Sequence, residues 1–207
     1  MRIILPAALV ILFGATAARA ARPDEKSPLR FTSEIVGRSY CAGGGIHILQ
    51  LRLRLRYQNT GGRKLIVYRG KNLFYQTKVR GGPPTGARPW QYEVAILNAR
   101  FNDAQAEAIN GARPGAAFVV LPPGGLYETE IIVGVGVTPE GAGRAANTIR
   151  PGEHTLQVIA STWYESKKLG EELRGRWRAS GLLWTEPVAT EPLKFAAAPD
   201  GPATVCR

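Results

Sequence analysis

The chain has 207 residues, 27 of them basic and 16 acidic, which gives a formal net charge of +11. Hydrophobic residues make up 44% of it, which excludes a disordered chain, and the length suits one domain with its own core. Because 24 residues are Gly and 15 are Pro, we expect many turns between short elements.

The first twenty residues have the pattern of a secretory signal peptide. Arg2 supplies a positive start, residues 3–18 are almost wholly apolar, and residues 18–20 (ARA) form a small-x-small cleavage site. The apolar stretch is shorter than the roughly 20 residues that a membrane-spanning helix needs. We therefore expect export to the periplasm or the extracellular space, a mature protein that begins at Ala21, and no membrane span in it.

The next segment and the two cysteines define the expected domain. Residues 21–30 are polar and interrupted by prolines, so they predict a flexible lead-in to a single domain over residues 31–207. Exported proteins keep their disulfides, so we predict a bond between Cys41 and Cys206 that ties the C-terminal tail to the N-terminal edge of the domain. The alternative, a catalytic thiol, lacks a His and an Asp or Asn nearby in the sequence.

The clearest strand signal covers residues 46–57 (IHILQLRLRLRY). Apolar and polar residues alternate there, which is typical of a strand with one buried face. A weaker alternation over residues 31–40 predicts an edge strand before it. A turn at residues 59–62 (NTGG) then leads into a second strong strand at residues 64–69.

Turn signals separate the later elements. A PPGG turn at residues 122–125 and a PG turn at residues 151–152 each precede an apolar strand. An Ala-rich stretch at residues 104–110 predicts one short helix, and the charged residues 165–176 are expected to form a protruding hairpin tip. The further strands are expected at residues 72–79, 90–97, 126–137, 153–165, 177–188 and 193–196.

These elements predict an all-β antiparallel β-sandwich of about seven to nine strands, with at most one short helix in a loop. The layout resembles bacterial secreted immunoglobulin-like domains over residues 51–70 (LRLRLRYQNTGGRKLIVYRG), the two Pro-Gly strand starts and residues 180–195 (SGLLWTEPVATEPLKF). The resemblance covers most of the mature chain and implies binding or scaffolding more often than catalysis. It transfers no site residues, and the two cysteines lie at the ends of the domain instead of in its core.

One strand face carries an arginine ladder, Arg52, Arg54 and Arg56. Arginine binds phosphate, sulfate and carboxylate groups through its planar fork, so the ladder is a candidate anion-docking face. In the alternative interpretation the ladder is a solvated face whose stems cover the sheet. Acidic partners on another strand, such as Glu128 or Glu130, would then neutralise it.

Two other residue groups carry weaker signals. His47 and His154 stand near the starts of strands, where a metal pair with Glu153 is conceivable, but such sites usually need three or more ligands, so we interpret them as histidines at the rim of the core. Four aromatic residues cluster towards the end of the sequence, where they either fill the core or form an exposed surface that binds carbohydrate. These are Trp163, Tyr164, Trp177 and Trp184.

No phosphate loop and no nucleophile elbow occurs in the sequence, so we expect neither catalysis nor a cofactor. Without Arg2 and Arg19 the chain keeps 25 basic and 16 acidic residues, a net charge of +9. We expect an exported, non-catalytic module that binds a protein or an anionic envelope polymer, and no nucleic acid. The alternatives are an inhibitor of secreted proteases that presents residues 165–176 or 81–89, a carbohydrate-binding module, and a hydrolase with an unrecognised site.

Overall fold

The computed structural model describes most of the expected domain and leaves several predicted features outside. It describes residues 27–43, 46–69, 74–81, 90–96, 111–115, 117–138, 148–161, 167–198 and 203–205. These ranges leave out the predicted signal peptide, the helix expected at 104–110, all but Gly81 of the loop predicted at 81–89, Trp163, Tyr164 and Cys206. The described part is mostly β-strand and contains one short helix, so the all-β prediction is confirmed.

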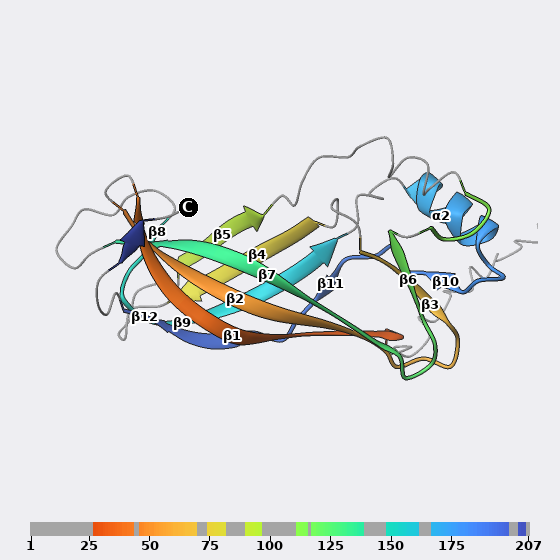
Figure 1. Cartoon of the computed structure of the whole chain (residues 1–207), viewed down its shortest axis with the longest axis horizontal. Helices are drawn as coiled ribbons and strands as arrows, with labels where there is room; N and C mark the ends of the chain where they lie inside the picture. The colour runs from red at the N-terminus through yellow and green to blue at the C-terminus, as the bar shows by residue number, and fades with distance from the viewer. Residues whose placement is uncertain are drawn as a thin grey trace, which may run out of the picture.

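Sheet A is built on three long antiparallel strands. They are β1 (Leu29–Gly43), β2 (Ile46–Asn59) and β7 (Leu126–Val137), with β2 between the other two (Figure 1). Two short strands pair in parallel with its outer strands: β13 (Thr204–Val205) with β1, and β8 (Thr148–Ile149) with β7. The strand order is therefore β13-β1-β2-β7-β8.

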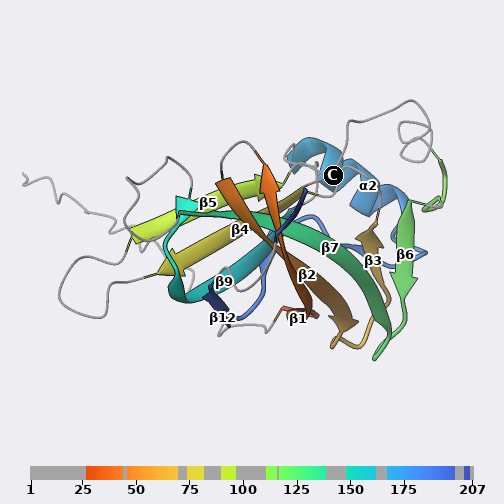
Figure 2. The same ribbon diagram turned by 60° about the vertical axis from the view of Figure 1, so that its left-hand side comes forward.

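Sheet C lies against one face of sheet A (Figure 2). Its central strands are β9 (Gly152–Ser161) and β4 (Phe74–Gly81), and β5 (Trp90–Ile96) pairs with the far side of β4. The other edge of β9 is covered by β11 (Val188–Ala189) and β12 (Leu193–Ala197), which pair with its two halves.

The core lies between these two sheets, and strand alternation explains it. On β2 every second side chain is buried and the residues between them are exposed or half-buried, which confirms the strand predicted over residues 46–57. The Tyr57 hydroxyl and the Tyr75 hydroxyl join sheet A to sheet C through a hydrogen bond of 3.0 Å. The buried β2 residues are Leu49, Leu51, Leu53, Leu55 and Tyr57.

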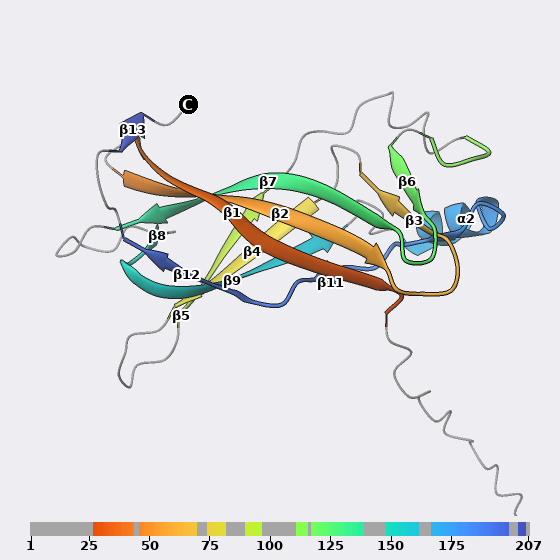
Figure 3. The same cartoon turned by 60° about the horizontal axis from the view of Figure 1, so that its bottom comes forward.

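A third sheet, sheet B, gathers with the helix at one end of the molecule (Figures 1 and 3). It contains β3 (Leu65–Tyr68), flanked by β6 (Phe118–Leu121) and β10 (Leu182–Leu183). The helix α2 (Lys167–Arg176) packs beside β10. Trp177, just after α2, is buried and meets Phe118 edge-on, with ring centroids 4.7 Å apart.

Asn59 holds the corner between sheets A and B, where β2 leads towards β3 and β6 leads towards β7. Its side chain is completely buried. The PPGG turn beside it has the geometry expected from the sequence, since Gly124 has a φ of 75° and the Gly125 amide donates to the Pro122 carbonyl. Asn59 hydrogen-bonds through its backbone and side chain with Gly61, Arg63, Leu121, Gly124 and Gly125.

The hairpin tip predicted at residues 165–176 is wrong, because residues 167–176 form α2. Leu169, Leu173 and Trp177 recur every four residues, which is a helical period. Leu173 and Trp177 are buried, while Glu171 and Glu172 are exposed to solvent. A charged composition therefore hid an amphipathic helix.

Four further expectations also differ from the structure. The strand at residues 64–69 does not pair with its predecessor, because β3 pairs with β6 and β10. The sheets are not purely antiparallel, since β8, β10 and β13 all pair in parallel, each over two residues. The first strand begins two residues earlier than expected, because β1 starts at the buried Leu29 and not at Phe31. The described residues contain thirteen strand segments, more than the seven to nine expected, because the short pieces count separately.

Candidate functional site

Two of the three ladder arginines are neutralised within sheet A. The strand register places Arg54 between Glu34 and Glu130, and the Arg54 guanidinium lies 3.3 Å from the Glu130 carboxylate. Arg56 binds Glu128 at 2.5 Å and lies 3.6 Å from Glu34. The hydrogen bond from Arg56 to Glu128, followed by the charge of Glu128, raises the pKa of Arg56 above its ordinary value. The interpretation in which acidic partners neutralise the ladder therefore holds for Arg54 and Arg56.

Arg52 differs from its two neighbours because no carboxylate faces it across the sheet. Its register partners are Gly37 on β1 and Ile132 on β7. Its side chain is exposed and forms no ion pair with any residue that the structure describes. The Arg52 guanidinium is therefore left for an external partner.

Gly37 gives Arg52 the space to lie flat on the sheet. A Cβ atom at Gly37 would come within 3.1 Å of Arg52 Nε and 3.2 Å of Arg52 Nη2. A β-bulge between Ile35 and Gly37 shifts the register by one residue and brings Gly37 opposite Arg52. The bulge and the glycine together position the guanidinium.

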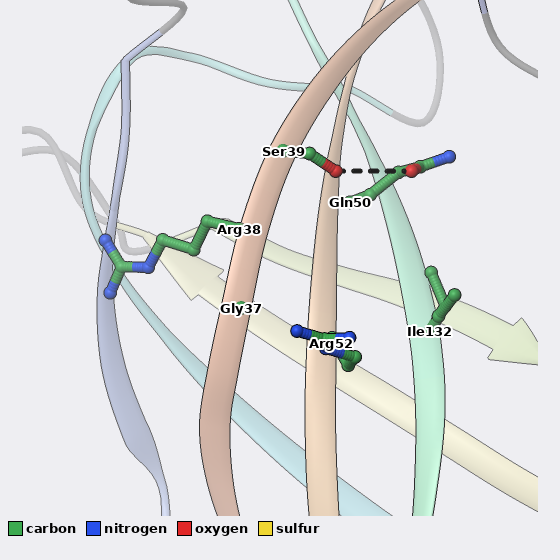
Figure 4. Close-up of a pocket in the computed structure, with 6 residues that line it drawn as sticks. All are labelled: Gly37, Arg38, Ser39, Gln50, Arg52 and Ile132. Atoms are coloured by element: carbon green, nitrogen blue, oxygen red, sulfur yellow. Dashed lines mark hydrogen bonds between the residues drawn. The ribbon is translucent and has the colours of Figure 1, made fainter.

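A shallow pocket of about 290 Å³ surrounds this guanidinium (Figure 4). On one side the Ser39 hydroxyl donates to the Gln50 side-chain oxygen over 3.4 Å, and on the other Ile132 is 61% exposed. Arg38 extends away from Arg52 (Figure 4). The lining residues are Gly37, Arg38, Ser39, Gln50, Arg52 and Ile132. The pocket combines two cations, Arg38 and Arg52, with polar groups and one apolar side chain.

Sequence reasoning found Arg52 but missed the residues that make it distinct. No motif marks Gly37 in the sequence, and its role depends on a β-bulge that the sequence pattern does not predict. The segment VGVGV at residues 133–137 held a better signal, because Gly134 and Gly136 interrupt the side chains of an otherwise apolar strand. Gly134 pairs with Gln50, and the Ile48 side chain lies beside it, since a Cβ atom at Gly134 would come within 3.3 Å of Ile48 Cγ2.

The histidines do not form a metal centre in the described part of the chain. His154 is buried, with its ring 5.4 Å from the Phe195 ring and its Nε2 atom 2.8 Å from the Arg150 carbonyl oxygen. His47 is half-buried on β2. No group of three or more His, Cys, Asp or Glu side chains that could hold a metal occurs among the residues the structure describes.

The C-terminal tail returns to β1 at the position of Cys41. The buried Cys41 pairs with Thr204 of β13, and the Ala198 amide donates to the Tyr40 hydroxyl over 2.9 Å. Cys206 follows two positions after Thr204 but lies outside the described residues. The register thus supports the disulfide as a prediction without testing it.

Trp177 and Trp184, the two late tryptophans within the described ranges, serve packing. Trp177 is buried, and its Nε1 atom donates to the Gly111 carbonyl over 3.0 Å. Trp184 is half-buried and packs against the core. These two side chains therefore do not present a flat platform to a sugar.

Among the described residues, no helix has both the length and the apolar character needed to cross a membrane.

Comparisons with protein-family models, with curated proteins and with solved structures found no match to this chain. Its function is therefore inferred from its own residues and their geometry.

Proposed function

We propose that this protein is an exported, non-catalytic binding module that docks an anionic group of its partner on the outer face of sheet A. Its architecture is proposed to be an immunoglobulin-like β-sandwich. Two facing sheets that share one core support that architecture. The signal-peptide pattern of residues 1–20 supports export.

The observation that carries the proposal is the unpaired guanidinium of Arg52. A guanidinium presents several N–H donors in one plane and keeps its charge at any physiological pH. Carboxylates of the same sheet already occupy Arg54 and Arg56, whereas Arg52 faces a glycine and an exposed isoleucine. An anion at Arg52 gains a charge-assisted hydrogen bond without displacing an internal partner.

The charge of the whole protein favours the approach of such a partner. The expected mature chain carries a net charge of +9, as counted above, and a field of this sign attracts anions over about 10 Å at moderate ionic strength. Long-range attraction raises the rate of encounter, and the local geometry at Arg52 selects where the anion rests.

A titration with poly-L-glutamate tests the proposal. NMR spectra of the isotope-labelled mature protein are expected to change at Gly37, Gln50 and Gly134 as the probe is added. Arg52→Gln should weaken binding, while the matched change Arg54→Gln should leave it nearly unchanged because Arg54 is already paired. Equal binding by both variants, or the absence of binding both to poly-L-glutamate and to the end-blocked peptide Leu-Glu-Leu, would contradict the proposed function.

Export has its own test. The mature protein recovered from its native compartment is expected to begin at Ala21 in intact-mass analysis. An N-terminus that retains Met1 would contradict it.

A further inference from the structure

The charges on the outer face of sheet A match a single anion better than a chain of anions. The arginine ladder contributes three positive charges, and Glu34, Glu128 and Glu130 contribute three negative ones, so these six side chains cancel. A polymer with regularly spaced anionic groups that ran along the ladder would pass from Arg52 over these carboxylates. The negative charges of these carboxylates repel the anionic groups of such a polymer.

The residue paired with Arg52 across the sheet offers an apolar contact that a polyanion does not use. Ile132 lies directly across the sheet from Arg52 and is 61% exposed, although isoleucine is usually buried. The next row contains Gln50 and Gly134, and no side chain rises from Gly134 to shield Ile132 from a partner. Burial of Ile132 would therefore add a hydrophobic contribution next to the charge.

The size of the pocket limits what it holds. Its volume of about 290 Å³ lies just below the range of roughly 300–1,000 Å³ that is common for small-molecule sites. Such a space suits one or two side chains of a partner. The Ser39 hydroxyl and the Gln50 amide border it and supply polar contacts beside the charge (Figure 4).

We propose that the Arg52 pocket binds a protein segment that presents one carboxylate next to an aliphatic side chain. The carboxylate of an Asp or Glu pairs with the Arg52 guanidinium, and the neighbouring aliphatic group packs on Ile132. This inference rests on the proposed binding function and names the class of partner. An anionic polysaccharide or wall polymer is the competing partner that the experiment separates from it.

The experiment compares three probes by NMR titration of the mature protein. They are an end-blocked tripeptide Leu-Glu-Leu, the same tripeptide with Gln in place of Glu, and dextran sulfate. We expect the Glu peptide to bind at Gly37, Gly134 and Ile132 about two- to fivefold more tightly than the Gln peptide, because one exposed ion pair distinguishes them. Its affinity should change little with salt, since only one pair of charges forms.

Two variants separate the contributions. Arg52→Gln should abolish the preference for the Glu peptide, and Ile132→Ser should weaken both peptides without affecting that preference. Arg54→Gln is the matched control and should leave peptide binding unchanged.

The outcomes that overturn the inference differ from those that overturn the proposed function. If dextran sulfate binds through Arg52 with a steep salt dependence and the Glu peptide does not bind there, the site serves an anionic polymer and only the inference fails. If no probe shows binding that depends on Arg52, both the inference and the proposed function fail.

Discussion

At the scale of single residues, the buried side chain of Asn59 forms three hydrogen bonds to backbone groups of the surrounding turns. Its side-chain nitrogen donates to the carbonyls of Arg63 and Leu121, at 2.8 and 3.0 Å, and its side-chain oxygen accepts from the Gly61 amide. Its backbone joins the turn at Gly124 and Gly125. A single buried amide therefore fixes two chain reversals at once, which places sheet B at the end of sheet A.

Replacing Asn59 with Ala should destabilise the protein by about 3 kcal/mol. The change removes three side-chain hydrogen bonds and leaves their partners unsatisfied near the core, at about 1 kcal/mol each. Urea unfolding of Asn59→Ala beside Gln58→Ala, the adjacent half-buried position, measures the difference. Equal stabilities for these two variants would show that Asn59 does not hold the corner.

The Tyr57–Tyr75 pair predicts a loss of stability at alkaline pH. Burial raises the pKa of Tyr57 well above the ordinary value of 10.0, with the neighbouring Tyr75 adding to the shift, and burial also raises the pKa of Tyr75. The folded state therefore holds both protons while the unfolded chain releases them, so the free energy of unfolding falls as the pH rises above about 10. Below that pH both states are protonated and this contribution is constant.

The measurement compares urea unfolding of wild type and Tyr57→Phe at about pH 8 and about pH 11. The variant should lose about 1 kcal/mol at the lower pH through the broken hydroxyl pair, and should lose less than wild type on going to the higher pH. An identical pH dependence of unfolding in both proteins would show that the Tyr57–Tyr75 pair does not cause the loss of stability at alkaline pH.

At the scale of elements, local patterns predicted strands well and failed where a long-range contact decides the structure. β2 follows from its alternation alone, because a buried face requires that pattern whatever its partners are. The partner of β3 does not follow from it, since Leu65 pairs with Leu121, far along the chain. The helix α2 has a different reason, because the spacing of Leu169, Leu173 and Trp177 is local but the charged composition around it favoured a hairpin tip.

The helix α2 is expected to depend on Leu173 for its position. Leu173 is fully buried, so Leu173→Ala should destabilise the protein by about 2–5 kcal/mol through lost burial and a residual cavity. Glu171→Ala, on the solvent side of the same helix, is the control and should change the stability by less than about 0.5 kcal/mol. Thermal unfolding followed by circular dichroism reports both variants, and similar losses for the two would mean that the helix packs through another face.

At the scale of the whole molecule, the candidate site shows the limit of a sequence reading. The arginine ladder is visible in the sequence because its spacing is local. Which arginine is unpaired is not visible, since the neutralising residues Glu128 and Glu130 arrive from β7 in a register set by the fold. Gly37 likewise acquires its role only through the bulge in β1.

The C-terminal tail returns to the first strand of the domain. The tail runs beside β1 in parallel, with Thr204 opposite Cys41, and the Thr204 hydroxyl donates to the Tyr40 carbonyl. These contacts involve few residues and a mostly exposed strand, so they cannot hold the tail by themselves. A Cys41–Cys206 disulfide would close a loop over most of the domain, which is worth about 5 kcal/mol if chain entropy alone is counted.

Peptide mapping of protein from its native compartment, under non-reducing conditions, should find Cys41 linked to Cys206. Cys206→Ser should lower the free energy of unfolding by up to about 5 kcal/mol, whereas Thr204→Ala should lower it by less than about 1 kcal/mol, because that change removes one exposed hydrogen bond. Two free thiols in the mapped protein would refute the disulfide. A Cys206→Ser variant as stable as wild type would show that the register of β13 alone keeps the tail against β1.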